Sequence, residues 1–269
     1  MNIKEPEALL KYRDAHTRRA AIMEQLKQSG FVTIADLTAQ LGVSEMTIRR
    51  DMRRLDEEGQ AISVRGALRL PFTDADIERA SPEYQCRISD ASQAKEIIGR
   101  LAVREIRDDD VIAIDAGTTA LQVAMALPEN FTGTVVTHSI AVTHYLLSRP
   151  PVKTISLGGD IYHKSCALVG SATVDNANRL RTRIFFLGAA AADERGIYVS
   201  ADVEKLVKQT LMGIANQIIL VIDHRKFYIT APVLLCAWEE LDTVISDKVP
   251  LPGILSFLKE KGIRVVLPE

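Results

Sequence analysis

Residues 41–51 read Leu-Gly-Val-Ser-Glu-Met-Thr-Ile-Arg-Arg-Asp, and this stretch decides the fold of the first part of the chain. Gly42 can adopt the backbone angles that end a helix. Ser44 can cap the next helix by accepting a hydrogen bond from a backbone N–H group in its first turn. From Ile48 to Leu55, apolar residues then recur at i, i+4 and i+7 and share one face. The stretch therefore predicts a tight turn followed by a helix with one buried face.

The polar side chains of this helix are of types that suit DNA. Four arginines stand within six positions, with one Asp between them. The planar guanidinium group carries several donors, which fit phosphates and the edge of guanine. The alternative is a helix whose arginine face is simply solvated, as charge runs on helices usually are. The residues that we expect to contact DNA from this stretch are Ser44, Glu45, Thr47, Arg49, Arg50, Arg53 and Arg54.

The flanking sequence predicts the rest of a winged helix-turn-helix. Before the stretch, Ile22 and Leu26 belong to a helix that Gly30 ends, and Thr33 can cap a short apolar-faced helix. Two short helices, a glycine turn and an arginine-faced helix make a helix-turn-helix, whose second helix enters the major groove. After it, residues 62–70 roughly alternate apolar and polar about an Arg-Gly turn, as in a β-hairpin wing. We expect Arg65 in this wing to contact the DNA backbone or minor groove.

Composition limits the remaining possibilities. With 269 residues, the chain is long enough for a second domain of about 180 residues with its own core. The net charge is only −2, so DNA affinity must come from local arginines and from pairing of two copies. Three widely separated cysteines have no zinc or disulfide spacing, and we expect neither a metal nor a cofactor. No apolar run reaches membrane-spanning length, so we expect a cytoplasmic protein without a membrane partner.

The second part of the chain alternates apolar β-rich runs with helical patterns, which indicates a largely parallel sheet covered on both faces. The expected strands are 111–115, 134–137, 154–157, 184–188, 218–223, 244–245 and 263–267. The expected helices are 91–106, 121–127, 140–147, 173–180, 204–215 and 254–259. We expect the domains at 15–70, with a linker at 71–90, a sensor domain at 91–250, and a helix and strand at 251–269 that complete it.

Polar residues gather after these strands, where ligands bind in parallel sheets. In the segment 115–119, Asp-Ala-Gly-Thr-Thr follows a strand and opens a helix. Gly117 allows a tight turn, and the N–H groups and hydroxyls of Thr118 and Thr119 can hold a phosphate. A well-capped helix start without a ligand is the alternative. The segment matches neither a Walker loop nor a dinucleotide turn.

Further candidates for effector binding follow the other strands or lie on the helix near residue 204. Each has a plain structural alternative: a turn for the glycines, a satisfied loop histidine for His138, a surface ion pair for Asp223 with Lys226, and a helix-stabilising pair for Glu204 with Lys208. The full set of expected effector-binding residues is Asp115, Gly117, Thr118, Thr119, His138, Ser139, Gly158, Gly159, Glu204, Lys208, Asp223 and Lys226.

Both halves of the chain resemble the DeoR family of repressors. The first half resembles its DNA-binding domain through Leu41, the Val-Ser pair at 43–44, the Thr-Ile-Arg-Arg-Asp run at 47–51 and Gly59, whereas the wing departs from the usual Gly-Gly-Ala. The region from about residue 87 to 247 resembles its sensor domain. The motifs that carry this second resemblance are Asp-x-Gly-Thr-Thr at 115–119, Leu-Gly-Gly at 157–159, Phe-Leu-Gly at 186–188, Glu-x-x-x-Lys at 204–208 and Asp-x-x-Lys-Phe at 223–227.

The resemblance implies a Rossmann-like α/β sensor domain, related in fold to ribose-5-phosphate isomerase and the CoA transferases. It also implies a phosphorylated sugar as effector, with its phosphate on Gly117, Thr118 and Thr119. His138 stands where the family often has Asn and is expected to face the ligand. We therefore expect a non-enzymatic regulator, a homodimer or homotetramer that represses a carbohydrate-utilisation operon by binding double-stranded operator DNA until the sugar phosphate releases it.

Two alternatives remain open at this point. The chain could be a sugar-phosphate isomerase with a DNA-binding appendage, using Asp115, Glu204, Asp223 and Lys226 as base and electrophile. It could also be an activator, or a regulator whose pocket no longer binds a ligand. No acid/base pair stands at a fixed spacing, so we assign no catalytic residue.

Overall fold

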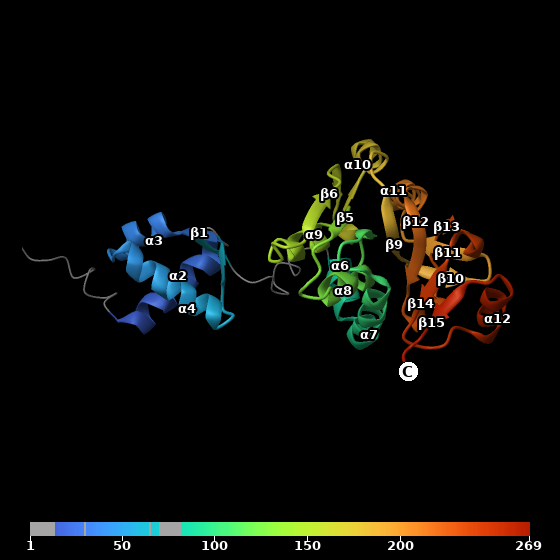
Figure 1. Cartoon of the computed structure of the whole chain (residues 1–269), viewed down its shortest axis with the longest axis horizontal. Helices are drawn as coiled ribbons and strands as arrows, with labels where there is room; N and C mark the ends of the chain where they lie inside the picture. Colours follow the sequence, from blue (N-terminus) through green and yellow to red (C-terminus); the bar gives the residue numbers. More distant parts are fainter. Residues whose placement is uncertain (1–13, 30, 65, 70–81) are drawn as a thin grey trace, which may run out of the picture. The chain divides into compact units, whose positions relative to one another are not determined.

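The computed structural model describes residues 14–29, 31–64, 66–69 and 82–269, and the chain divides into two compact units, residues 1–75 and 76–269. Figure 1 shows both units. Within the described residues, the first contains three helices and a small sheet, and the second contains a large sheet with helices packed on it. Each unit has a hydrophobic core of its own.

The first unit is a winged helix-turn-helix, as predicted. Its core collects the apolar faces of the three helices together with Val32 and Leu68 from the sheet. The three short strands form an antiparallel sheet in the order β1-β3-β2, and β1 was not expected from the sequence. The elements are α2 (Ala15–Ser29), β1 (Phe31–Thr33), α3 (Ile34–Leu41), α4 (Glu45–Glu57), β2 (Ile62–Val64) and β3 (Ala67–Arg69).

The caps and the wing follow the sequence. Thr33 caps α3 in a reciprocal arrangement with Asp36, and Gly42 ends α3 with a left-handed φ of 62°. Strands β2 and β3 pair so that Val64 lies opposite Ala67, which confirms the hairpin. Arg65, expected to contact DNA from the turn of this hairpin, lies outside the described residues.

The second unit is built on a seven-stranded, wholly parallel sheet in the order β15-β14-β12-β9-β4-β5-β6. This confirms the expected α/β fold, and every strand predicted from the sequence is present within a few residues. The central strands carry buried apolar runs, Ile184–Leu187 in β9 and Ile219–Val221 in β12, because helices cover both faces. The strands are β4 (Val111–Ile114), β5 (Thr134–Thr137), β6 (Lys153–Ser156), β9 (Thr182–Gly188), β12 (Ala215–Val221), β14 (Thr243–Ile245) and β15 (Arg264–Val266).

The strand order reverses direction between β4 and β9. From β4 the chain steps through α8 and α9 toward the β6 edge, whereas from β9 it steps through α11 and α12 toward the β15 edge. Because such crossovers are right-handed, the two sets of helices cover opposite faces, and a crevice opens where the direction changes. The helices are α7 (Ser92–Ala102), α8 (Thr118–Ala126), α9 (Ile140–Leu146), α10 (Ser171–Ala177), α11 (Asp202–Ile214) and α12 (Pro252–Glu260).

Several smaller elements of the second unit were not predicted from the sequence. Helix α6 (Pro82–Ser89) lies within the stretch that the sequence assigned to a linker, and its Tyr84 is fully buried. A hairpin, β7 (Asp160–Tyr162) with β8 (Ala167–Val169), includes the short helix η2 (His163–Ser165). A second antiparallel sheet joins β10 (Ala191–Asp193), β11 (Gly196–Val199) and β13 (Val233–Cys236). The remaining short helices are η1 (Val103–Glu105), η3 (His224–Phe227) and η4 (Trp238–Glu240).

Among the described residues, none of the helices has the length and apolar character needed to cross a membrane.

Candidate functional site

Helix α4 begins and packs as the sequence predicts. Ser44 accepts a hydrogen bond from the backbone N–H of Thr47 at 3.3 Å, and Gly42 completes the turn before it. Ile48, together with Met52 and Leu55, is buried in the core of the winged helix. The N-terminus of α4 is therefore fixed by a side-chain cap, and one face of the helix is anchored against the rest of the unit.

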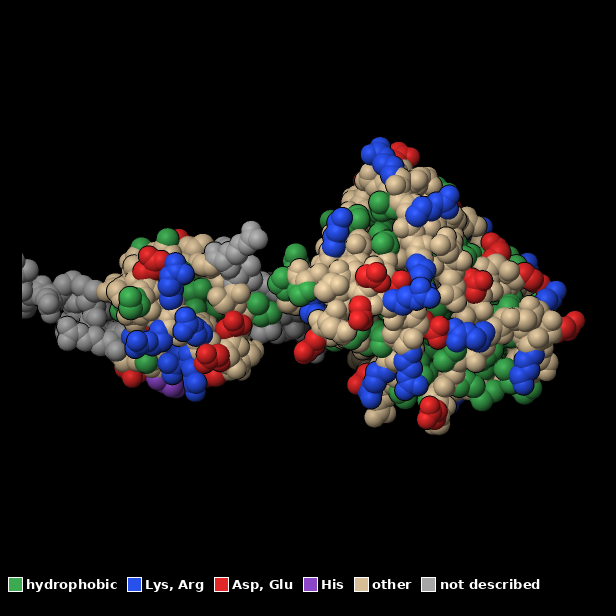
Figure 2. Space-filling view, viewed as in Figure 1, with side chains coloured by type: hydrophobic (Ala, Val, Ile, Leu, Met, Phe, Trp, Pro, Cys, Tyr) green, Lys and Arg blue, Asp and Glu red, His purple; other side chains and the backbone are tan. Residues whose placement is uncertain are grey.

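The face of α4 opposite the core is exposed and basic. Met46, Arg50 and Arg53 recur at i, i+4 and i+7, two positions out of step with the buried stripe. Met46 is 75% exposed. No ion pair is recorded for Arg50 or Arg53 within the described ranges, so their guanidinium groups are available to phosphates and bases. Figure 2 shows Lys and Arg side chains gathered over α2 and α4.

The remaining expected DNA contacts lie beside this face. Arg49 forms an exposed ion pair with Glu45 at 2.6 Å, and Arg54 forms one with Glu58 at 2.6 Å. Exposed pairs of this kind contribute little free energy, so DNA phosphates can replace them. Thr47 lies in the first turn, next to the cap.

Asp51 has a role that the sequence did not reveal. In the sequence it is only the acidic residue between the arginines of α4. In the structure it is 2% exposed and forms a buried ion pair with Arg18 of α2. Arg19 lies 3.7 Å from its other oxygen. Since breaking a buried pair leaves an uncompensated charge, Asp51 fixes α4 to α2 and thereby sets the position of the arginine face.

In the second unit, the Asp-Ala-Gly-Thr-Thr segment lies at the point where the strand order reverses. It connects β4 to the N-terminus of α8. Gly117 is the N-cap residue with a φ of 154°, and no side chain caps the helix. A Cβ atom at Gly117 would meet no atom within 4 Å, so the glycine borders open space. The first N–H groups of α8 therefore face a position where an anion can bind.

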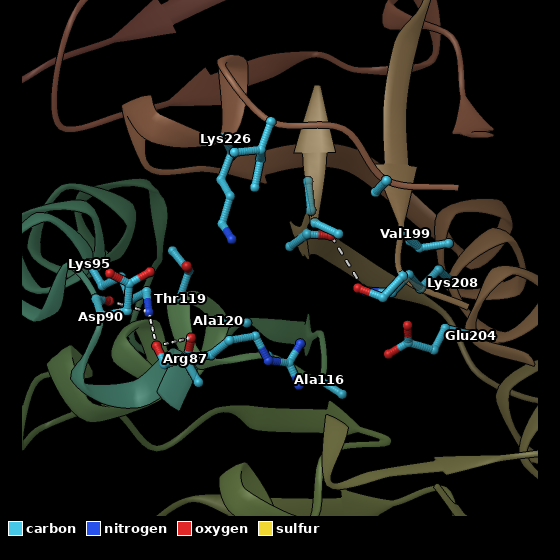
Figure 3. A pocket seen from close by; sticks show the side chains of 18 of the residues that line it. Arg87, Asp90, Lys95, Ala116, Thr119, Ala120, Val199, Glu204, Lys208 and Lys226 are labelled. Carbon is cyan, nitrogen blue, oxygen red and sulfur yellow. Dashed lines mark hydrogen bonds between the residues drawn. The ribbon is translucent and has the colours of Figure 1, made fainter. Parts of the chain in front are cut away.

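A cavity of about 240 Å³ lies over this helix N-terminus. Figure 3 shows side chains converging on it from α6, α7, α8, α11 and the segment after β12. Six of the expected effector-binding residues line it: Gly117, Thr118, Thr119, Glu204, Lys208 and Lys226. Small residues at the end of β9 and just after it, Gly188 to Ala190, also line the cavity.

Lys208 and Asp115 form the buried base of this cavity. Lys208 pairs with Asp115, which also accepts backbone N–H groups from Gly188 at 2.8 Å and Ala116 at 2.9 Å. Burial raises the pKa of Asp115, while Lys208 and the two N–H groups oppose the rise. Lys208 thus pairs with Asp115, after β4, rather than with Glu204 on its own helix. The structure therefore does not contain the helix-stabilising pair of Glu204 with Lys208.

Three residues that the sequence did not single out complete the cavity: Arg87, Asp90 and Lys95. The ammonium of Lys95 donates to the carbonyls of Arg87 and Asp90, the latter at 2.7 Å. Burial is the main cause that lowers the pKa of Lys95 to about 8; within that net shift Asp223 acts against the lowering and Lys226 adds to it. The signal for Arg87 and Asp90 lay in α6, whose Pro82-Glu83 start is typical of a helix N-terminus.

The other expected effector-binding residues do not line this cavity. His138 is fully buried, 3.4 Å from Asp115, and burial together with Lys208 lowers its pKa to about 3. Asp223 turns to Arg225, with the nearest atoms 3.2 Å apart, rather than to Lys226. Ser139 caps α9 instead. Asp115 lies beneath the cavity, paired with Lys208, and Gly158 and Gly159 are not part of its lining.

The first unit is a winged helix with an exposed arginine face, and the second is an α/β unit with a cavity at its switch point. This combination is typical of DNA-binding regulators that carry a ligand-binding domain. Comparison with known families agrees. Residues 18–73 match the model of the DeoR-like helix-turn-helix domain, and residues 90–248 match that of the DeoR C terminal sensor domain. The chain belongs to the DeoR family of transcriptional regulators.

Curated relatives match along most of their length. The HTH-type transcriptional regulator YgbI of Escherichia coli K12 is 32% identical over 86% of this chain and 89% of its own. The HTH-type transcriptional repressor GlcR of Bacillus subtilis 168 is 29% identical over 94% and 96%. The glycerol-3-phosphate regulon repressor of Escherichia coli K12 is 27% identical over 93% and 98%.

Among solved structures, ribose 5-phosphate isomerase A from Methanocaldococcus jannaschii covers 51% of this chain and 54% of its own, with 16% identity and a TM-score of 0.38. A likeness at this level is too weak to carry an argument. The fold class rests on the parallel sheet itself and on the two family matches.

Proposed function

We propose that this chain represses transcription by binding operator DNA as a homo-oligomer, and that a phosphorylated sugar in the cavity of the second unit releases it. The observation that carries the proposal is the combination of an uncapped α8 N-terminus with the cations Arg87, Lys95 and Lys226 around one cavity. The names of the similar repressors, one of which governs a glycerol-3-phosphate regulon, support the same class of effector.

The phosphate would lie on Gly117, Thr118 and Thr119. The N–H groups and the positive end of the helix favour an anion there, and the two hydroxyls add donors. In Figure 3 the side chain of Lys226 extends from the segment after β12 toward the part of the cavity where Thr119 and Lys95 lie. Within the described residues Lys226 has no ion pair, so its charge is available to a phosphate.

The release of DNA would begin at α6. The backbone carbonyl of Arg87, near the end of α6, accepts hydrogen bonds from the Thr118 hydroxyl at 3.2 Å and from Lys95. A phosphate that recruits these two donors competes with that carbonyl. Because α6 begins soon after the segment that follows the winged helix in the sequence, a shift of α6 would reach the DNA-binding unit.

Direct binding of ligands tests this proposal. By calorimetry the full chain should bind one or more of a panel of phosphorylated sugars and should not bind the corresponding unphosphorylated sugars. Thr119→Val and Lys226→Met should each weaken the binding, whereas Lys205→Met, on the cavity-bearing helix α11 but outside the lining, should not. Equal binding of phosphorylated and unphosphorylated sugars would contradict the proposal.

We also propose that the chain is not an enzyme. Of the four residues that the isomerase alternative would use, only Glu204 and Lys226 line the cavity. Asp115 is instead fully buried against Lys208. Incubation of the purified chain with each bound sugar phosphate should leave it unchanged, and isomer formation that scales with protein concentration would contradict this assignment.

A further inference from the structure

Glu204 has an unusual environment in the second unit. The residue is only 5% exposed, yet its carboxylate forms no hydrogen bond or ion pair with the described residues. Its helical neighbour Lys208 is turned away to Asp115. Figure 3 shows both oxygens of Glu204 directed toward the open part of the cavity. The carboxylate therefore has its unoccupied acceptor positions on the ligand side.

A ligand that fills the cavity must give this carboxylate a hydrogen-bond donor, because a carboxylate that is shut off from water without a partner is unfavourable. The phosphate-binding residues cannot supply that donor, since they are directed to an anion. A ligand that brings both a phosphate and hydrogen-bond donors satisfies both ends of the site. Sugar hydroxyls are such donors, and a carboxylate can accept several of them.

A second cavity adjoins the first at Glu204. The two share Arg87, Ser200 and Glu204 in their linings. The second has a volume of about 670 Å³ and extends between α6 and η2, past Cys86 and Ser165. The first, at about 240 Å³, falls below the roughly 300–1,000 Å³ of typical small-molecule sites, whereas the second lies within that range.

We propose that this second cavity is the subsite for the hydroxyl-bearing end of the effector, with Glu204 as the acceptor at the junction. The inference rests on the proposed function, because it assumes a phosphate over α8. It narrows the effector to phosphorylated polyhydroxy compounds long enough to pass Glu204. Hexose and hexitol phosphates belong to this class. Glycerol 3-phosphate is too short to belong to it and would leave the second cavity empty.

The hydroxyl of Ser165 supports a polar ligand in this cavity. It is buried and has no hydrogen-bond partner in the described structure, so rotation of its side chain would give the ligand a further donor or acceptor. Arg87 holds the two walls together, since its guanidinium donates to the backbone carbonyl of Lys164 while its own carbonyl accepts from Thr118. A ligand that fills both cavities thus contacts α6 from two sides.

The test compares ligand length with cavity variants in the full chain. Calorimetry would measure inorganic phosphate, glycerol 3-phosphate, glucose 6-phosphate, fructose 6-phosphate and mannitol 1-phosphate. Cys86→Phe, at an exposed position of α6 in the lining, fills the second cavity without touching the first. Glu204→Gln removes the charge while keeping the shape. Asp202→Asn removes one charge from the same helix outside both cavities and is the matched control.

We expect at least one six-carbon phosphate to bind about tenfold or more tightly than glycerol 3-phosphate. Cys86→Phe and Glu204→Gln should each remove most of that difference, and Asp202→Asn should preserve it. Cys86→Phe, which lies outside the lining of the first cavity, should leave the affinity for inorganic phosphate unchanged. If long and short phosphates bind equally and Cys86→Phe changes neither, the subsite is wrong and the phosphate site stands. If no phosphorylated compound binds, the subsite and the proposed function both fall.

Discussion

Buried acidic residues show how single side chains organise both units. Asp51 is neutralised by Arg18 and fixes the DNA-facing helix, and Asp115 is neutralised by Lys208 beneath the cavity. Glu204 alone has no recorded partner within the described residues. Partnered buried charges are structural, because their free energy depends on the partner, whereas an unpartnered one beside a cavity points to a ligand. The sequence could not separate these roles, since each partner is distant in the chain.

The buried pair of Asp115 and Lys208 should dominate the stability of the second unit. Asp115→Asn leaves the ammonium of Lys208 buried without a counter-charge and should cost about 3–5 kcal/mol in the free energy of unfolding. Denaturant unfolding followed on the second unit measures this. The double variant with Lys208→Met should recover most of the loss, and Asp175→Asn, at an exposed position on α10, should stay within about 0.5 kcal/mol of the parent. A single variant as stable as the parent would contradict the role.

Lys95 should give phosphate binding a distinct pH dependence. Burial lowers its pKa from the ordinary 10.5 to about 8, so its ammonium is charged below pH 8 and loses the proton above it. Affinity for a phosphate should therefore be full near pH 7 and decline between pH 8 and 9. The effect on folding stability has the opposite sign. Below pH 8 the buried ammonium of Lys95 lowers the free energy of unfolding. Between about pH 8 and 10.5 the folded chain loses this proton while the unfolded chain keeps it, so the free energy of unfolding rises with pH.

Calorimetric titrations with the preferred sugar phosphate from pH 7 to 9.5 test this dependence. Lys95→Arg keeps its charge throughout the range and should flatten the decline. A parental decline that persists unchanged in Lys95→Arg would assign the titration to another group.

At the scale of elements, the pattern of apolar residues in the sequence predicted the main helices and strands. Helix α4 and the wing hairpin were expected from apolar residues that recur at a fixed spacing. The seven strands of the parallel sheet were expected from apolar runs that alternate with helical patterns. Strand β1 and the sheet of β10, β11 and β13 were missed. In these sheets β1 pairs with β3 and β11 pairs with β13, and each pair joins segments that lie far apart in the sequence. Helix α6 was missed because its surroundings are rich in loop residues, and with it Arg87 and Asp90 were missed in the cavity.

The outward face of α4 should carry operator recognition. Arg50 is exposed, is opposite the buried stripe and has no recorded ion pair in the described ranges. Arg50→Ala should cost about 1–3 kcal/mol of operator binding and relax the sequence preference, while effector binding stays unchanged. Arg100→Ala, at an exposed position of the second unit, is the matched control. Quantitative gel shifts on specific and scrambled DNA measure both, and equal affinities for parent and Arg50→Ala would contradict the assignment.

At the scale of the whole molecule, function depends on two units that each fold around a core of their own. The net charge of −2 provides no general attraction to DNA, so the affinity must come from the arginine face of α4, together with the homo-oligomer that we propose. An effector can release the DNA only if it binds the free and DNA-bound arrangements unequally. The contacts from Thr118 and Lys95 to α6 are where we propose that this difference arises.

The most direct test of this account is the binding of the full chain to the DNA upstream of its own gene, titrated with phosphorylated sugars and with their unphosphorylated counterparts. The account predicts specific binding that one phosphorylated sugar releases and its unphosphorylated form does not, with the release lost in Thr119→Val. Specific binding that no phosphorylated sugar alters, or release that both forms produce equally, would contradict it.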